Sequence, residues 1–110
     1  MALMQRFQAA SEHAMKQLTK YKFRLYVAGE SMNSALARAN LSKFCESYLA
    51  GRHEIEIVDV FREPGRALQD SIFLTPTLLK LAPSPVRKIV GTLSQAATVA
   101  QVLGLGDVVP

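Results

Sequence analysis

Two strand-forming segments flank one helical segment, and this arrangement restricts the possible folds more than any other feature of the sequence. Residues 21–27 alternate large apolar and basic side chains, then become continuously apolar before Gly29. Residues 55–60 are β-branched and mostly apolar, as in a strand of a sheet that is covered on both faces. A strand, a helix and a strand in this order predict two parallel strands joined by a right-handed crossover.

The predicted helices follow from apolar periodicity and from the residues that suit their ends. The helix between the two strands is expected over residues 35–49, with Asn33 or Ser34 as its N-cap and an end near Gly51. A second helix is expected after Pro64, because the first turn of a helix tolerates a missing N–H. Its apolar stripe consists of Ala67, Leu68, Ile72 and Phe73.

After this second helix, the sequence pattern changes from helical to that of strands and turns. Residues 75–81 predict an extended segment entered through Pro76. Residues 86–90 predict its partner in a hairpin, after a turn that contains Pro83 and Pro85. The expected order is therefore βαβαβ followed by one more strand.

Helical patterns also mark the two ends of the chain. Leu3, Phe7, Ala10, Ala14 and Leu18 recur at the spacing of an amphipathic helix. We therefore expect an N-terminal helical extension over residues 1–20. Ser94 is the predicted N-cap of a final helix that runs to residue 103, which completes the order βαβαββα.

Length and composition favour one soluble domain. A chain of 110 residues fits a single core, which we place in residues 21–105, with a short tail over residues 106–110. No apolar run reaches the roughly 18 to 20 residues that a membrane-spanning helix requires, and the N-terminal residues lack the pattern of a secretory signal. We expect a cytoplasmic protein that does not interact with membranes.

The residue types that carry most enzyme chemistry are sparse. Cys45 is the only cysteine, so neither a disulfide nor a CxxC motif is possible, and we expect it to be buried on a helix. His13 and His53 lack the spacing of metal ligands. The net charge of +4 is spread along the chain, without the basic clusters or aromatic platforms of nucleic-acid binding. We expect no catalysis, no cofactor, no metal and no nucleic-acid partner, but a domain that binds proteins.

The predicted order, with a proline just before the third strand, resembles the thioredoxin-like fold, in which that proline is typically cis. Redox members of the fold carry a CxxC pair at the start of the first helix, whereas residues 29–34 here read GESMNS. Without a thiol at that place, disulfide exchange has no nucleophile. One hypothesis is therefore a thioredoxin-like stress or redox-related protein with a peptide or small-molecule groove near Pro76.

Four segments together carry a more specific resemblance. They are LYVAG at residues 25–29, IVDV at residues 57–60, TPTLLK at residues 75–80 and PSPVRKIVG at residues 83–91. The sequence resembles the KaiB family over about residues 21–105. The resemblance implies a non-enzymatic partner of KaiC, a two-lobed P-loop ATPase, in circadian timing or in a related signalling or stress-adaptation pathway.

The resemblance also implies that the same chain has two folds. One is a tetrameric ground state whose C-terminal half takes a different order of elements, and the other is a thioredoxin-like monomer that binds KaiC. Apolar periodicity favours the thioredoxin-like order of elements. The sequence alone does not show which of the two folds is more stable, because such folds differ by only a few kcal/mol in free energy. We expect a homo-oligomer, a dimer or tetramer, because the apolar stripe of residues 3–18 adds surface that one small domain cannot cover.

Two sets of residues are candidates for these functions. Lys80, Arg87 and Lys88 match basic positions of the family and are the predicted partner-binding residues, with a solvated, charge-protected hairpin edge as the alternative. Pro76, Pro83 and Pro85 are the predicted fold-switch residues, with static turns as the alternative.

Two departures from the family pattern suggest a homologue outside the core cyanobacterial clock. Leu36 stands where clock members often carry a basic residue, and Glu56 stands where they often carry lysine. The partner surface is therefore expected to differ from that of the clock members.

Overall fold

The computed structural model describes residues 19–105, and their elements follow the order predicted from the sequence. The strands are β1 (Tyr21–Val27), β2 (His53–Asp59), β3 (Thr77–Ala82) and β4 (Arg87–Val90). The helices are α2 (Met32–Tyr48), α3 (Pro64–Gln69) and α4 (Ala96–Val102). The βαβαββα order is thus confirmed, while the predicted N-terminal helical stripe and the tail lie outside the described residues.

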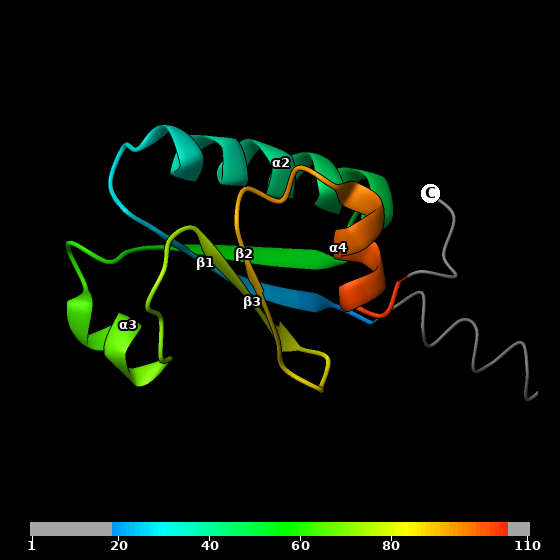
Figure 1. Ribbon diagram of the computed structural model, residues 1–110. Coiled ribbons are helices and arrows are strands. Elements are labelled where there is room, and N and C mark those ends of the chain that lie inside the picture. The colour runs from blue at the N-terminus through cyan, green and yellow to red at the C-terminus, as the bar shows by residue number, and fades with distance from the viewer. Residues whose placement is uncertain (1–18, 106–110) are drawn as a thin grey trace, which may run out of the picture.

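The four strands form one mixed sheet in the order β2-β1-β3-β4 (Figure 1). β1 pairs in parallel with β2 and antiparallel with β3, and β3 pairs antiparallel with β4. β2 is therefore an edge strand, although its apolar sequence predicted a strand covered on both faces. Val58 is fully buried, but Ile57 is 37% exposed because β2 has a neighbour on one side only.

The main core lies on the face of the sheet that α2 and α4 cover (Figure 1). Alternate residues of β1 point to this face, and they meet the apolar sides of the two helices. The largest fully buried side chains of this main core include Phe23, Leu25, Leu41 and Leu78. Cys45 of α2 belongs to the same cluster and is fully buried, which confirms its predicted place on a helix.

A smaller cluster lies on the opposite face, under α3. It consists of Tyr26, Val58, Ala67, Ile72 and Leu79. Two of the four residues predicted for the apolar stripe, Ala67 and Ile72, are buried. The prediction was wrong for the other two, because Leu68 is 73% exposed and Phe73 is 84% exposed. The helix ends at Gln69, after less than two full turns, so the stripe is not continued through Phe73.

The helix caps differ from the predicted ones. Ser31 caps α2, one turn before the expected start, and its hydroxyl accepts a hydrogen bond from the Ser34 N–H. Ser34 is buried inside the first turn instead of capping it. Gln95 precedes α4 in the cap position without a side-chain bond to the helix backbone, so the prediction of Ser94 as the cap was also wrong.

Candidate protein-binding site

The first turn of α2 carries two serines at the spacing of a CxxC pair. Ser31 and Ser34 lie three residues apart, and their hydroxyl oxygens are 2.7 Å from each other. The Ser34 hydroxyl also accepts a hydrogen bond of 3.0 Å from the Ala28 N–H at the end of β1. These hydroxyls hold the strand-to-helix turn together.

The one cysteine is unsuited to thiol chemistry. Cys45 lies in the middle of α2 and is fully buried. Burial first, and the charge of Glu46 second, raise the pKa of the Cys45 thiol to about 12. Because the thiolate is the reactive form, this side chain is inert at neutral pH.

Four large apolar side chains are exposed at one end of the sheet. The parallel strands β1 and β2 end there, and β3 begins there, since Tyr26 pairs with Thr77. Met32, in the first turn of α2, and Phe61, Phe73 and Leu74, in the connections, lie at this end and are 79%, 75%, 84% and 63% exposed. We call these four residues the apolar rim.

A glycine allows one of these rings to approach the β1–α2 turn. Gly29 has a φ of +54°, a backbone conformation that other residues rarely adopt. The Phe61 ring lies 3.5 Å from the position that a Cβ atom on Gly29 would occupy. The turn after β1 and the turn after β2 are therefore adjacent at the apolar rim.

The structure brings two of the three predicted basic residues together. Lys80 of β3 and Arg87 of β4 are directly paired across the hairpin. Both point to the α4 side of the sheet, where Lys80 is 4% exposed and its ammonium lies 6.0 Å from the centre of the Tyr21 ring. Burial, and secondly the charge of Arg87, lower the pKa of Lys80.

Lys88 lies on the other face of the sheet. Its ammonium donates hydrogen bonds to the backbone oxygens of Asp70 and Ser71, at 3.3 and 3.0 Å. These oxygens follow the end of α3, so Lys88 ties β4 to that helix. Arg87 and Lys88 are neighbours in sequence but do not form one basic patch, because adjacent strand residues point to opposite faces.

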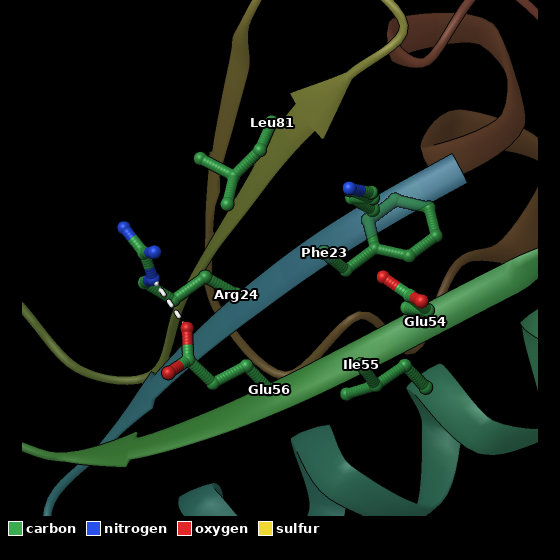
Figure 2. Close-up of a pocket in the computed structure, with 7 residues that line it drawn as sticks. Phe23, Arg24, Glu54, Ile55, Glu56 and Leu81 are labelled. Atoms are coloured by element: carbon green, nitrogen blue, oxygen red, sulfur yellow. Dashed lines mark hydrogen bonds and ion pairs between the residues drawn. The ribbon is translucent and has the colours of Figure 1, made fainter. Parts of the chain in front are cut away.

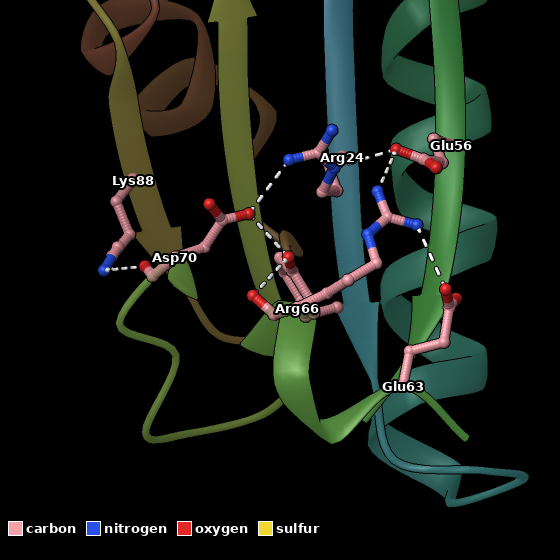
Figure 3. Close-up of polar contacts among 7 residues, drawn as sticks. Arg24, Glu56, Glu63, Arg66, Asp70 and Lys88 are labelled. Atoms are coloured by element: carbon pink, nitrogen blue, oxygen red, sulfur yellow. Dashed lines mark hydrogen bonds and ion pairs between the residues drawn. The ribbon is translucent and has the colours of Figure 1, made fainter. Parts of the chain in front are cut away.

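An ion-pair network crosses the α3 face of the sheet (Figure 3). Arg24 of β1 bonds Glu56 of β2 at 2.8 Å and Asp70, just after α3, at 2.9 Å. Arg66 of α3 bonds the same Glu56 oxygen at 2.8 Å and also contacts Glu63 at 3.4 Å. Figure 3 shows the Arg66 side chain between the two glutamates. Glu56 thus joins two strands to α3, at a position where the family resemblance led us to expect lysine.

The network holds its carboxylates ionised. Hydrogen bonds from Arg66 and then Arg24 lower the pKa of Glu56 to about 2. The pKa of Asp70 is lowered chiefly by the hydroxyl of Tyr26, which donates a hydrogen bond of 2.5 Å. Sequence reasoning missed this network because Arg24 is 32 residues from Glu56 and 46 residues from Asp70. The alternation of charged residues on β1 and β2 was the one available signal.

Beyond the short helix α3, the same face of the sheet is open. A groove of about 440 Å³ lies there. Figure 2 shows Arg24 and Glu56 in it, pointing toward each other from adjacent strands. Lys22 pairs with Glu54 one step further along the same two strands, and Leu81 of β3 adds an apolar side. Positive and negative side chains alternate along this groove, so it presents no single sign of charge.

The three predicted fold-switch prolines lie at the two ends of β3. Pro76 precedes the strand, while Pro83 and Pro85 lie in the turn that leads to β4. All three of their peptide bonds are cis, as expected from the resemblance for Pro76. The Pro76 carbonyl accepts a hydrogen bond of 2.9 Å from the Gly91 N–H, which closes the open end of the hairpin.

Residues 19–105 contain neither a metal-binding cluster nor a membrane-spanning helix. No group of three or more histidine, cysteine, aspartate or glutamate side chains there is placed to hold a metal ion. No helix of this part of the chain is long and apolar enough to span a bilayer. The ring nitrogen Nδ1 of His53 lies 2.9 Å from the Leu49 carbonyl oxygen, so this side chain has a hydrogen-bond partner.

Solved structures place the fold among thioredoxin-like domains. The chain is similar to chloroplastic thioredoxin z, with a TM-score of 0.65 and 20% identity over 90% of this chain and 88% of that one. It is also similar to the N-terminal domain of Synechococcus elongatus SasA, with a TM-score of 0.60 and 16% identity over 78% of this chain and 85% of that one. Fold and site together define a thioredoxin-like domain with serines in place of the thiol pair.

The sequence comparisons identify the family. Residues 24–105 match the KaiB domain. The chain is 39% identical to the circadian clock protein KaiB3 of Synechocystis sp. over 84% of this chain and 88% of that protein. It is 43% identical to the circadian clock oscillator protein KaiB of Cyanothece sp. over 67% of this chain and 70% of that protein. The chain belongs to the KaiB family, whose members are not enzymes.

Proposed function

We propose that this protein regulates a KaiC-like P-loop ATPase by binding to it, in circadian timing or in a related signalling or stress-adaptation pathway. Membership of the KaiB family supports the proposal, as do relatives that are named circadian clock proteins. The structural observation that carries it is the apolar rim, in which four large side chains at one end of the sheet are each mostly exposed. Exposed apolar clusters of this kind are typical of surfaces that bind other proteins.

The two phenylalanines of the apolar rim are the proposed anchors of this contact. Large aromatic side chains are enriched at the centres of interfaces, where truncation of a single one often costs about 2 kcal/mol or more of binding free energy. Phe73 and Phe61 are mostly exposed and are free to enter pockets on a partner. This surface adjoins Pro76. The proposed partner site therefore lies at the same end of the domain as the peptide or small-molecule groove of the alternative hypothesis.

The test is a binding titration against the KaiC homologue of the same organism, with ATP and with ADP. We expect Phe73→Ala to weaken binding at least tenfold, which corresponds to about 1.4 kcal/mol. Val86→Ala is the matched control, because Val86 is 57% exposed in the turn at the opposite end of the sheet. Unchanged affinity in both Phe73→Ala and Phe61→Ala would exclude the apolar rim as the contact.

The basic residues are proposed to guide the approach of an acidic partner surface. Charges that lie away from the apolar contact act through their long-range field, mainly on the association rate and its salt dependence. Arg87 is exposed and is suited to this role, whereas Lys88 is engaged with the backbone after α3. We expect Arg87→Glu to slow association more at low salt than at high salt. A rate that does not change in either condition would exclude this guiding role of Arg87.

The family resemblance further supports a change of fold that gates binding, with Pro76, Pro83 and Pro85 in the half of the chain that rearranges. If the competent state forms before binding, the observed association rate reaches a plateau as the partner concentration rises. Stopped-flow measurements distinguish this from a rate that keeps rising in proportion. We also propose self-association to a dimer or tetramer, which light scattering at increasing protein concentration tests.

A further inference from the structure

A small basic pocket lies between the β3–β4 hairpin and the C-terminal end of α4. It has a volume of about 290 Å³, and Tyr21, Lys80, Arg87 and Gln101 are among the residues that line it. Lys80, one of these lining residues, is 4% exposed, and its ammonium group lies 6.0 Å from the centre of the Tyr21 ring. This pocket is separate from the apolar rim, which lies at the other end of the sheet.

Within residues 19–105, no carboxylate forms an ion pair with either cation of this pocket, Lys80 or Arg87. No aspartate or glutamate is among the described residues that line the pocket. The nearby end of α4 contributes at most about half of one negative charge, so the two full positive charges prevail.

The remaining lining supplies hydrogen-bond donors and limits the size of a ligand. The Ser84 hydroxyl and the Gln101 amide lie in the wall, and neither carries a formal charge. Pockets for drug-sized ligands usually range from about 300 to 1,000 Å³, so this one suits a small group and not a large molecule. Lysine and arginine side chains together are suited to bind the oxygen atoms of a carboxylate or a phosphate group.

We propose that the Lys80–Arg87 pocket binds one small oxyanion, a carboxylate or a phosphate group. A buried lysine without a carboxylate partner is unfavourable, and a bound anion supplies the missing partner. The proposal concerns the isolated protein. Its test is therefore independent of the proposed binding to a KaiC-like ATPase, and failure of one proposal does not affect the other.

The test is an NMR titration of the whole chain with inorganic phosphate, and in parallel with the α-amide of N-acetylglutamate, at constant ionic strength. We expect saturable shifts of the amides of Ser84, Val86, Arg87 and residues 101–104 with at least one of the two probes. Saturation with one probe and not the other assigns the oxyanion to phosphate or to carboxylate. Lys80→Met and Arg87→Met should each weaken the binding at least tenfold.

Lys88→Met is the matched control, because this lysine is on the same strand as Arg87 but on the opposite face. Its affinity for the probe should equal that of the unmodified protein. Equal loss in Lys88→Met and Lys80→Met would show a diffuse charge effect and overturn the proposal, as would shifts that never saturate. If Lys80→Met fails to fold, Arg87→Met decides the question, since unchanged binding in that variant equally contradicts the pocket.

Discussion

Removal of the Tyr26 hydroxyl tests the energetic role of the polar contacts under α3. The Tyr26 side chain is fully buried, and its hydroxyl donates to an Asp70 oxygen at 2.5 Å, with the Arg66 carbonyl 3.1 Å away. Tyr26→Phe leaves the ring in place and removes this bond. Asp70 then keeps Arg24 as its charged partner, at 2.9 Å.

The expected loss follows from the charge on the acceptor. A hydrogen bond to a charged group contributes about 1.5 to 3 kcal/mol to stability. Because the Asp70 side chain is 27% exposed and keeps Arg24, we expect the lower part of that range, about 1.5 to 2 kcal/mol. For a domain of this size, that is a decrease of roughly 6 to 16 °C in Tm.

The loss should also depend on pH. The Tyr26 hydroxyl is the main reason that the pKa of Asp70 is below its ordinary value of 3.8. A carboxyl group whose pKa is lowered in the folded state stabilises above its unfolded pKa, and this stability is lost as the pH falls. The difference between the unmodified protein and Tyr26→Phe should therefore be complete at pH 7 and should shrink as the pH falls below about 4, the ordinary pKa.

Urea unfolding at pH 7, 5 and 3 measures both effects. Tyr48→Phe is the control, since the Tyr48 hydroxyl makes no hydrogen bond with another of the residues 19–105 in the structure, and this variant should stay within about 0.5 kcal/mol. A double-mutant cycle with Asp70→Asn isolates the pair. A coupling energy near zero, or a loss that is the same at pH 7 and pH 3, would refute the reasoning.

Two further predictions concern Lys88 and Cys45. Lys88→Met should lower stability by about 1 kcal/mol and speed hydrogen exchange near the end of α3, whereas Arg87→Met should leave that exchange unchanged. Exchange that is equal in the two variants would contradict the tie between β4 and α3. Cys45 should react with a thiol reagent at pH 8 at least 100-fold more slowly in the native than in the unfolded protein, because burial raises its pKa to about 12. Fast native labelling, or insulin reduction that Cys45→Ser abolishes, would show that the thiol is accessible.

Local patterns in the sequence predicted the elements, but not which strands lie at the edges. The apolar run of β2 is equally compatible with a central and an edge strand, since order in a sheet depends on contacts between distant segments. The cap of α2 was misplaced for a related reason. Asn33, Ser34 and Ser31 all suit an N-cap, and the choice of Ser31 depends on the bond that Ser34 makes with Ala28 at the end of β1.

The candidate site was predictable to the extent that it depends on neighbours in sequence. The hairpin itself pairs Lys80 with Arg87, so these two residues were correctly considered together. Lys88 was grouped with them because it adjoins Arg87, yet the alternation of side chains along a strand sends it to α3. The apolar rim was not predicted, because its residues come from three separate parts of the chain and the helical stripe assigned Phe73 to the interior.

The strand order β2-β1-β3-β4 has a mechanical consequence. The first half of the chain supplies β1 and β2, the second half supplies β3 and β4, and within the sheet the halves meet along one seam, between β1 and β3. The register of that seam shifts between Lys22 and Phe23. Within the sheet, breaking this one antiparallel ladder therefore separates the two halves, because the β1–β2 and β3–β4 pairings each lie inside one half.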